Sequence, residues 1–502
     1  MSNQTLHRLL PAIIVVLLLG IFSYFRVPSL ISQTVPYTFD QGRDFLAARD
    51  IVKNLDLKLI GPTTGLSGLF HGVWWYYFLT IPYILTGGNP TGFYAAIFLL
   101  GAAWTVLFSF FIKRELGLVT GLLALLLLSV SPYFIKTSLF AINSVLALPF
   151  LALFLYSLYQ YLKVRKPRYL FLISFSIGFI AEAELAFGLF LIPAFIISIF
   201  AGRVGKKFFG SVSKIRAFLV GFAVPFAPRV IFELKNGFMQ TRTLIEYFYN
   251  PADPHPSELK GLVWERLKLF REFYFKLFSS DFPYLGVIIG VIALGGLLIG
   301  YKRFLRHQKR FVQMLVFMLA ALYGLSLLVK NSFFWANYFE GLPLLYLMII
   351  LIGFHGFVVS RQRVPRFILA SVTVFLVVMT ASQIYLSRTL PREQNLTGLR
   401  VHTKTIQYLY DQAGKAEFCA RIYTPPVIPH TYNYLLDYYA GILDAQYPRT
   451  EYIDNKCFYI IESDANKERR AAWIADNISE DAQFENREWI SRDVVVELWK
   501  ME

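Results

Sequence analysis

The sequence predicts a polytopic α-helical membrane protein with a small α/β domain at its C-terminal end. Three observations predict this fold class. Of the 502 residues, 56% are hydrophobic and only 16% are charged, which excludes an ordinary soluble enzyme and a disordered chain. Apolar stretches long enough to cross a bilayer recur along residues 1–386, whereas residues 387–502 are more polar. The chain has two cysteines, so a disulfide-built scaffold is excluded too.

The net charge of +16 is divided unevenly along the chain. Residues 1–386 hold 35 Lys/Arg and 15 Asp/Glu, a balance of +20, and residues 387–502 hold 14 and 18, a balance of −4. A basic excess confined to the loops between spans is typical of membrane topology, because cytoplasmic loops are enriched in Lys and Arg. Nucleic acid is therefore not an expected partner.

Each crossing of the hydrocarbon core needs roughly 17 to 25 apolar residues, and this length identifies the spans. The sequence predicts eleven of them, near residues 8–25, 92–112, 116–131, 144–162, 169–183, 185–201, 215–232, 282–300, 311–329, 338–358 and 366–386. The first has no small-residue cleavage site and ten more follow it, so we predict a retained helix and not a removed signal peptide.

Residues 71–86 are apolar enough to count as a further span, and the charges decide against it. If this segment lies flat on the membrane, the even-numbered connections and Arg8 together place twenty Lys/Arg against one acid, Glu115, on one side. The other fourteen acids of residues 1–386 fall on the opposite side, which is then predicted to be extracytoplasmic. We therefore predict an interfacial helix here, which its Trp and Tyr residues also favour.

The predicted outer side carries a first loop at 26–91, a second large loop at 233–281 and the C-terminal domain. We place the transmembrane domain at 1–386 and the soluble domain at 387–502. In the latter, strands are predicted at 417–423, 456–463 and 493–499, and helices at 399–413 and 465–477. Cys419 and Cys457 pair if their strands are neighbours in an oxidising compartment, and are otherwise buried free thiols.

The first outer loop contains YTFDQGRDFLAARDIVKNL (37–55), in which Asp40 precedes a helical pattern with an apolar face that includes Phe45 and Leu55. An aspartate at this place is either an N-cap, which satisfies free backbone N–H groups, or a catalytic carboxylate at the water–lipid boundary. The pattern alone leaves both open.

Four segments, taken in order, carry a family resemblance: FDQGRDFLAARDI (39–51), LIGPTTGLSGLFHGVWWYYFLTIPYILTGGNP (59–90), SPYFIKTSLFAIN (131–143) and ANYFEGLP (336–343). Residues 1–386 thereby resemble the C-type integral-membrane glycosyltransferases, in particular the protein O-mannosyltransferase and aminoarabinose transferase group, which use polyprenyl-phosphate-linked sugars. The resemblance implies that Asp40 is the general base on the acceptor hydroxyl. Direct attack on an anomeric carbon, with inversion, requires a carboxylate near the nucleophile and cations near the departing phosphate.

Cations on the predicted outer side are candidates for binding the donor phosphate: Arg43, Lys136, Arg229 and Arg242. Arg43 could equally pair with Asp44 or with lipid headgroups. Arg229 lies near the outer end of its span, where a cation usually has an anionic partner; this is either the phosphate or Glu233, one turn further on.

Further candidates for the substrate cavity are His71, Asn143, Glu182, Glu184, Tyr338 and Glu340. Glu182 and Glu184 interrupt an apolar stretch, and they either contact sugar hydroxyls, assist the base or form a short polar turn at the outer surface. His71 either binds a phosphate or transition metal or is a hydrogen-bonded structural residue. Tyr338 either lines the cleft with Glu340 or belongs to an aromatic belt.

The chain departs from the family pattern at three places. Gln41 stands where relatives often have a second acid, Asn143 where some have an aspartate, and His71 and Gly72 where some have an acid–lysine pair. Because the carboxylates that hard cations prefer are mostly missing from these loops, we name no cofactor and do not expect a divalent-metal site.

The sequence has no Walker loop, dinucleotide fingerprint, HExxH or paired CxxC motif. We predict an enzyme that transfers a sugar from a polyprenyl-phosphate donor to a hydroxyl or amine of a lipid, glycan or protein acceptor. Its site would lie on the extracytoplasmic face of a prokaryotic plasma membrane, in contact with membrane lipids. The alternative is a non-enzymatic translocase of lipid-linked sugars or a cell-envelope assembly protein, which predicts charged residues deep inside the spans.

Overall fold

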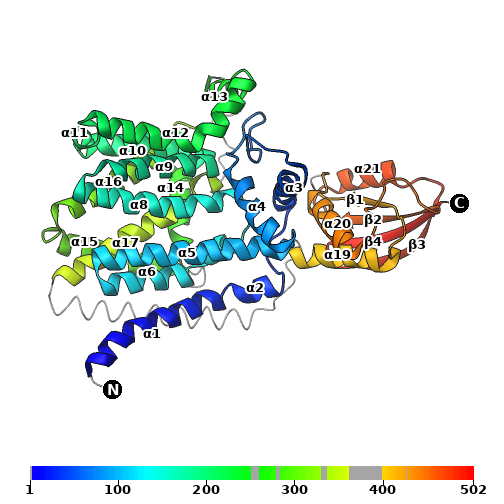
Figure 1. The fold of residues 1–502 in the computed structure, drawn as a ribbon, viewed down its shortest axis with the longest axis horizontal. Helices are drawn as coiled ribbons and strands as arrows, with labels where there is room; N and C mark the ends of the chain where they lie inside the picture. The colour runs from blue at the N-terminus through cyan, green and yellow to red at the C-terminus, as the bar shows by residue number, and fades with distance from the viewer. Residues whose placement is uncertain are drawn as a thin grey trace.

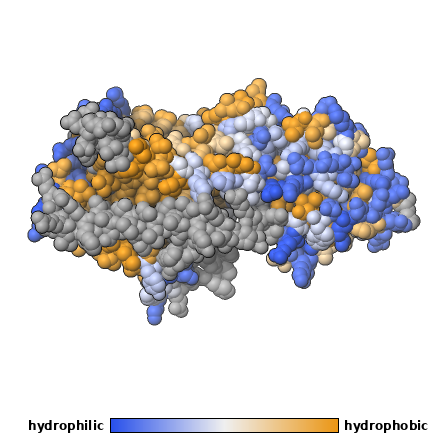
Figure 2. Space-filling model, turned by 90° about the horizontal axis from the view of Figure 1, so that it is seen from below, coloured by the Kyte–Doolittle hydropathy of each residue, from blue (hydrophilic) through white to orange (hydrophobic). Residues whose placement is uncertain are grey.

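The computed structural model describes residues 3–249, 259–278, 283–329, 336–360, 398–425 and 427–501. Figure 1 shows most of the long helices of the first 360 residues, such as α5 (Pro90–Leu116), α8 (Ala147–Val164) and α12 (Val212–Lys235), lying along the long axis of the molecule, with a small sheet at one end. Hydrophobic residues gather on the helical part and hydrophilic residues on the C-terminal part in Figure 2. We call residues 398–501 the C-terminal part.

Ten bundle helices coincide with the first ten predicted spans: α1 (Asn3–Tyr24), α5 (Pro90–Leu116), α6 (Leu118–Val130), α8 (Ala147–Val164), α9 (Pro167–Ala183), α10 (Leu185–Ala201), α12 (Val212–Lys235), α15 (Pro283–Tyr301), α16 (Arg306–Ser326) and α17 (Leu342–Ser360). Among the described residues, seven helical segments are long and apolar enough to cross a membrane, and two apolar helices are shorter. The chain is therefore an integral membrane protein. The predicted span at 366–386 lies outside the described residues, so the total of eleven stays a prediction.

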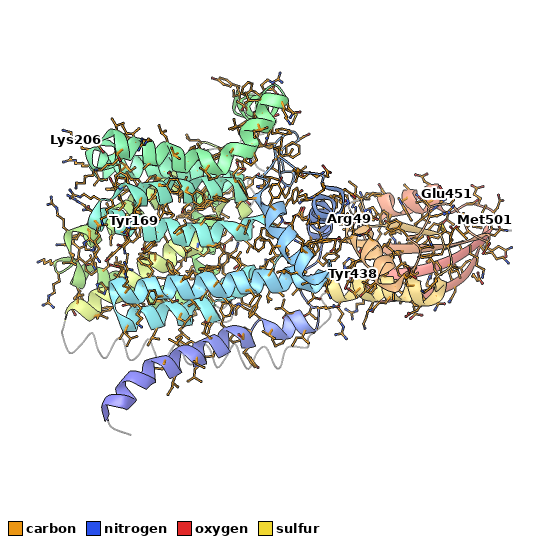
Figure 3. All side chains as sticks on the ribbon, in the orientation of Figure 1. Arg49, Tyr169, Lys206, Tyr438, Glu451 and Met501 are labelled. Atoms are coloured by element: carbon orange, nitrogen blue, oxygen red, sulfur yellow. A yellow bond between two sulfur atoms is a disulfide. The ribbon has the colours of Figure 1, made fainter. Side chains whose placement is uncertain are left out.

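The remaining helical elements of this part are α2 (Val27–Ile31), α3 (Phe39–Asn54), α4 (Trp74–Thr86), α7 (Pro132–Thr137), η1 (Asn143–Leu146), α11 (Gly205–Phe209), α13 (Met239–Tyr249), α14 (Leu259–Phe275) and η2 (Ala336–Phe339). Figure 3 labels Lys206, in α11, at the end of the bundle far from the sheet, and Arg49, in α3, at the end that carries it. Lys206, which belongs to one of the basic connections, and Arg49, in the first outer loop, thus lie at opposite ends, in agreement with the charge pattern.

α3 and α4 lie between the bundle and the sheet (Figure 1). The 13 residues of α4 are too few to cross the bilayer, because they extend only about 20 Å. On α3, Phe45 is fully buried as predicted. Leu55 was predicted on the same apolar face, but its side chain is 78% exposed, because the residue ends the helix in a left-handed conformation with φ of 52°.

The C-terminal part contains a sheet of order β1-β2-β4-β3. Its elements are α19 (Leu399–Ala413), β1 (Ala420–Tyr423), α20 (His430–Leu443), β2 (Lys456–Glu462), α21 (Lys467–Asn477), β3 (Ala482–Trp489) and β4 (Val494–Met501). β1 pairs with β2 in parallel, and β4 lies antiparallel to both β2 and β3. The sequence did not predict α20 or β3. β3 is exposed along almost its whole length, so it lacks the apolar alternation of a half-buried strand.

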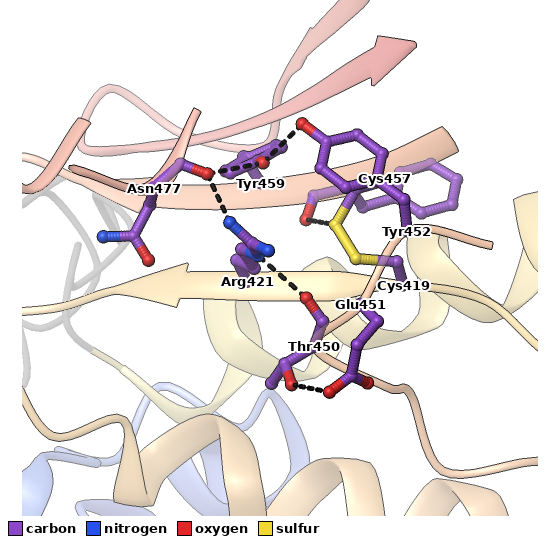
Figure 4. The surroundings of a disulfide bond; sticks show 9 residues. Cys419, Arg421, Thr450, Glu451, Tyr452, Cys457, Tyr459 and Asn477 are labelled. Atoms are coloured by element: carbon purple, nitrogen blue, oxygen red, sulfur yellow. Dashed lines mark hydrogen bonds between the residues drawn. A yellow bond between two sulfur atoms is a disulfide. The ribbon is translucent and has the colours of Figure 1, made fainter. Parts of the chain in front are cut away.

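Cys419 and Cys457 form a disulfide, shown in Figure 4. Their pairing follows from the adjacency of β1 and β2, which brings the two Cα atoms to 4.5 Å. Beside it, Arg421 donates hydrogen bonds to the carbonyls of Thr450, at 2.8 Å, and Asn477, at 2.5 Å. A disulfide here is what we expect of a domain outside the cytoplasm.

The C-terminal part packs against the first outer loop. Leu399 donates its backbone N–H to the Val35 carbonyl at 3.0 Å, and the Tyr37 hydroxyl donates to the Thr431 carbonyl at 2.9 Å. The backbones of α3 and α20 meet at Gly42, where an added Cβ would lie 2.4 Å from the His430 carbonyl carbon. The position of α3 is therefore set from both sides, by the bundle and by the C-terminal part.

Candidate active site

Asp40 lies in the first turn of α3 and does not cap it. The cap is made by Thr38 and Gln41: the Gln41 side-chain oxygen accepts hydrogen bonds from the Thr38 backbone N–H and hydroxyl, each at 2.8 Å. The N-cap alternative for Asp40 is therefore wrong, because Thr38 occupies that position. Gln41 also donates to the Ala141 carbonyl at 3.2 Å, which ties α3 to the loop before η1.

The Asp40 side chain is 55% exposed and pairs with Arg43 at 3.0 Å. Arg43 also contacts Asp44 at 2.8 Å, and Asp44 accepts a hydrogen bond from the Trp75 indole at 2.7 Å. Burial raises the pKa of Asp44 to about 6, although Arg43 and the Trp75 hydrogen bond oppose this. The guanidinium of Arg43 is thus shared between two carboxylates and holds Asp40 at the start of the helix.

A second ion pair joins α9 to α12. Arg229 contacts Glu182 at 2.6 Å, and it donates to the Phe70 carbonyl at 2.9 Å and to the Gln240 side chain at 2.7 Å. Glu182 is 1% exposed, and the ion pair compensates its burial inside the protein.

Glu233, the alternative partner of Arg229, has a different role. Its carboxylate accepts hydrogen bonds from the backbone N–H groups of Gln240, at 3.1 Å, and Thr241, at 3.0 Å. Glu233 therefore satisfies the free N–H groups at the start of α13.

His71, Glu184 and Tyr338 line a cavity of about 140 Å³, which we call the His71 cavity. Burial and the nearby charges of Arg229 and Arg43 lower the pKa of His71 to about 3, so its imidazole is neutral at neutral pH. Glu184, at the turn between α9 and α10, is 6% exposed. Burial and the charge of Glu340 raise the pKa of Glu184 well above its usual value. Three predicted cavity residues thus meet here.

A larger cavity of about 750 Å³ contains Lys136 and Glu340. We call it the large cavity. Its walls are aromatic, with Tyr133 and Phe273 among them, and Arg271 and Lys276 add two cations that the sequence analysis missed. The segment REFYFK (271–276), which alternates cations with aromatic residues in a predicted outer loop, could have indicated them. Burial raises the pKa of Glu340, against the charges of Lys276 and Lys136.

Asn143 and Arg242 line neither cavity and take no part in the two ion pairs described above. Asn143 donates a hydrogen bond to the Ala183 carbonyl at 2.5 Å, which ties η1 to the turn between α9 and α10. Arg242 is exposed, and its guanidinium faces Gly237. The first of these residues has a structural contact, and the second is not brought to the site.

His430 also lies beside the Asp40 helix, and nothing in the sequence pattern indicated it. Its ring packs against Phe39 with centroids 4.8 Å apart, and its Nδ1 is a buried nitrogen without a hydrogen-bond partner in the described part of the chain. Burial and Arg43 lower its pKa. The same described residues contain no group of three or more His, Cys, Asp and Glu that could hold a metal ion.

Comparison with known proteins shows what the chain is similar to. The family model described as dolichyl-phosphate-mannose-protein mannosyltransferase matches residues 71–232. The fold is similar to that of ArnT from Cupriavidus metallidurans bound to undecaprenyl phosphate, with a TM-score of 0.59, 13% identity and 97% of each chain covered. The apo state of the same protein gives a TM-score of 0.56, 13% identity and coverage of 99% of this chain and 98% of that one. No curated protein matches in sequence.

The family match over residues 71–232 and the fold likeness to ArnT both agree with the resemblance to the C-type integral-membrane glycosyltransferases that the sequence indicated. The family match begins at His71 and ends within α12, so it does not include Asp40. The fold likeness to ArnT covers almost the whole chain, including the C-terminal part, which the resemblance read from the sequence had left out.

Proposed function

We propose that this protein transfers a sugar from a polyprenyl-phosphate donor to an acceptor nucleophile, with Asp40 as the general base. The observation that carries the proposal is the Asp40 carboxylate itself. It is 55% exposed, it has no capping role, and it is held by Arg43 at the outer end of a bundle that has the fold of this superfamily. A carboxylate so placed can accept a proton from a bound hydroxyl or amine.

The proposed step is a single displacement. Asp40 takes the proton of the acceptor O–H or N–H as that atom attacks the anomeric carbon of the sugar. The bond between the anomeric carbon and the phosphate oxygen breaks, and its electron pair leaves with the polyprenyl phosphate, so the configuration inverts. The phosphate is a good leaving group, and cations near it stabilise the charge that develops there.

We assign the donor to the large cavity. Its aromatic walls suit an isoprenoid chain and a sugar, and Lys136, Arg271 and Lys276 supply three cations for the phosphate. The printed description of ArnT, which names bound undecaprenyl phosphate, supports a lipid phosphate as the leaving group. Arg229 is a weaker candidate for the phosphate than we predicted, because Glu182 already pairs with it.

The remaining assignments keep the predicted topology. The site and the C-terminal part face the extracytoplasmic side of a prokaryotic plasma membrane, and the acceptor is a lipid, glycan or protein. Arg43 acts as a positioning residue, since Asp40 and Asp44 share its guanidinium. His71, Glu184 and Tyr338 contact the sugar or acceptor from the His71 cavity.

The test uses the purified protein in lipid with a panel of polyprenyl-phosphate sugars and records release of polyprenyl phosphate. We expect release by the wild type and a loss of about a thousandfold in Asp40→Asn. Asp50→Asn, on the same helix but paired with Arg49 at 2.8 Å, is the matched control and should keep its rate. If no donor is cleaved and lipid-linked sugars cross the bilayer equally in both proteins, the translocase alternative replaces the transferase.

A further inference from the structure

A third cavity, of about 180 Å³, lies between the first outer loop and the C-terminal part. We call it the Glu462 cavity. Tyr37, Thr38 and Phe39 form its wall on the membrane side, and Phe39 directly precedes Asp40 in the chain. On the other side its lining includes Glu462 and Asp493, from the sheet region. Phe39 is thus both a lining residue of this cavity and the chain neighbour of the proposed base.

The carboxylate of Glu462 is fixed by buried groups behind it. The Tyr432 hydroxyl donates to Glu462 Oε1 at 2.8 Å, and His402 Nε2 lies 3.2 Å from the same oxygen. Tyr432 is fully buried and His402 is 3% exposed, whereas the Glu462 side chain is 19% exposed. Buried polar groups are costly unless they are hydrogen-bonded. Because Tyr432 and His402 both contact the same oxygen of Glu462, they fix the orientation of its carboxylate.

Asp493 is oriented in a similar way on the rim. The Ser463 hydroxyl donates to its Oδ1 at 2.7 Å, and the Ser463 backbone N–H donates to its carbonyl at 2.7 Å. The described lining thus contains two oriented carboxylates and one histidine, and no Lys or Arg. Ionised carboxylates accept hydrogen bonds and repel anions, so this lining suits a ligand rich in donors and does not suit a phosphate.

We propose that the Glu462 cavity is an acceptor subsite that binds one sugar unit of a glycan acceptor. The volume has room for one sugar ring, the carboxylates accept from its hydroxyls, and the partly exposed ring of Phe39 offers an aromatic face for its C–H groups. The proposal rests on the proposed function, because it assumes that the acceptor deprotonated by Asp40 is a carbohydrate. The acceptor is then a glycan or glycolipid, and not a polypeptide.

The test measures binding and does not need turnover. Saturation-transfer NMR is recorded on the purified protein in lipid nanodiscs with a panel of methyl glycosides of hexoses and hexosamines. We expect saturation of the ring protons of at least one glycoside by the wild type and equally by Asp40→Asn. Asp493→Asn should reduce this signal and Glu462→Gln should abolish it, whereas Glu451→Gln, an exposed acid bonded to Thr450, should leave it unchanged.

Asp493→Asn keeps the test informative if Glu462→Gln unfolds the C-terminal part, because Asp493 lies on the rim and its hydrogen bond to Ser463 can be kept by an amide oxygen. The subsite is disproved if no glycoside is saturated by the wild type, or if the signal persists in both variants. It is equally overturned if Ser- or Thr-containing peptides, and not glycosides, lose saturation in the variants. Binding without any release of polyprenyl phosphate would reject the proposed function and leave the sugar site standing.

Discussion

The two cavities assigned to the substrates differ in charge. The large cavity, within the bundle, contains three cations (Lys136, Arg271 and Lys276) and two acids (Glu272 and Glu340), so its cations are in excess by one. The Glu462 cavity, beside the C-terminal part, contains two carboxylates and no Lys or Arg in its described lining. A transferase must keep an anionic donor and its acceptor on opposite sides of the reacting carbon. The difference suggests that the charge of each lining, as well as its shape, selects which substrate enters it.

Of the changes that test this comparison, the largest effect is expected from reversing a charge in the large cavity, to which the donor is assigned. Lys276→Glu makes the large cavity net negative, so a lipid phosphate there meets repulsion where it met attraction. We expect the KM for the lipid donor to rise about a hundredfold, which corresponds to about 2.7 kcal/mol, with little change in binding of methyl glycosides. Steady-state kinetics with varied donor measures this.

Lys268→Glu provides the control for that experiment. Lys268 is an exposed lysine on α14, the helix that ends at Phe275, directly before Lys276. It does not line the large cavity. If both variants raise the donor KM equally, the effect is one of overall charge, and the assignment of the donor to the large cavity is wrong.

The next largest effect concerns the contact between α3 and α20. Gly42→Ala places a Cβ 2.4 Å from the His430 backbone, so α3 and α20 must separate. Because Asp40 lies on α3, we expect transfer to fall about tenfold and the Tm to drop, since small shifts at a catalytic group are costly. Gly441→Ala, on α20 with open space around its added Cβ, should change neither. Normal transfer by Gly42→Ala would mean that the C-terminal part does not position the base.

Much of this architecture could be predicted because it depends on local patterns. Span length, the charge of alternating loops and the apolar face of α3 are properties of neighbouring residues, and they predicted ten helices and the helix that carries Asp40. The Thr38–Gln41 cap is also local, and its spacing could have shown that Asp40 does not cap the helix.

The rest depends on contacts between distant residues. The choice of Glu182 over Glu233 as the partner of Arg229 joins positions 47 residues apart. The Glu462 cavity joins residues around Tyr37 to residues beyond position 400. No periodicity encodes such pairs, and a single sequence gives no covariation, so His430 and Glu462 could not be identified before the fold placed them beside α3.

The smallest effect tests how Asp40 is held, through the pH dependence of stability. Asp44 has a pKa of about 6 in the folded protein, above the 3.8 of a free side chain, so the folded state binds more protons than the unfolded state between these values. Stability must therefore fall as pH rises through 6, by about 1 kcal/mol between pH 5 and pH 7 from this group alone. Asp44→Asn has no such titration, so its thermal unfolding midpoint should vary less over that range than the wild type's does.

A control variant, Asp56→Asn, changes an acid whose side chain is 51% exposed and should keep the wild-type slope. If the unfolding midpoint depends on pH equally in the wild type and Asp44→Asn, burial does not raise the pKa of Asp44. In that case Arg43 stabilises the charged form of Asp44 more strongly than it stabilises Asp40.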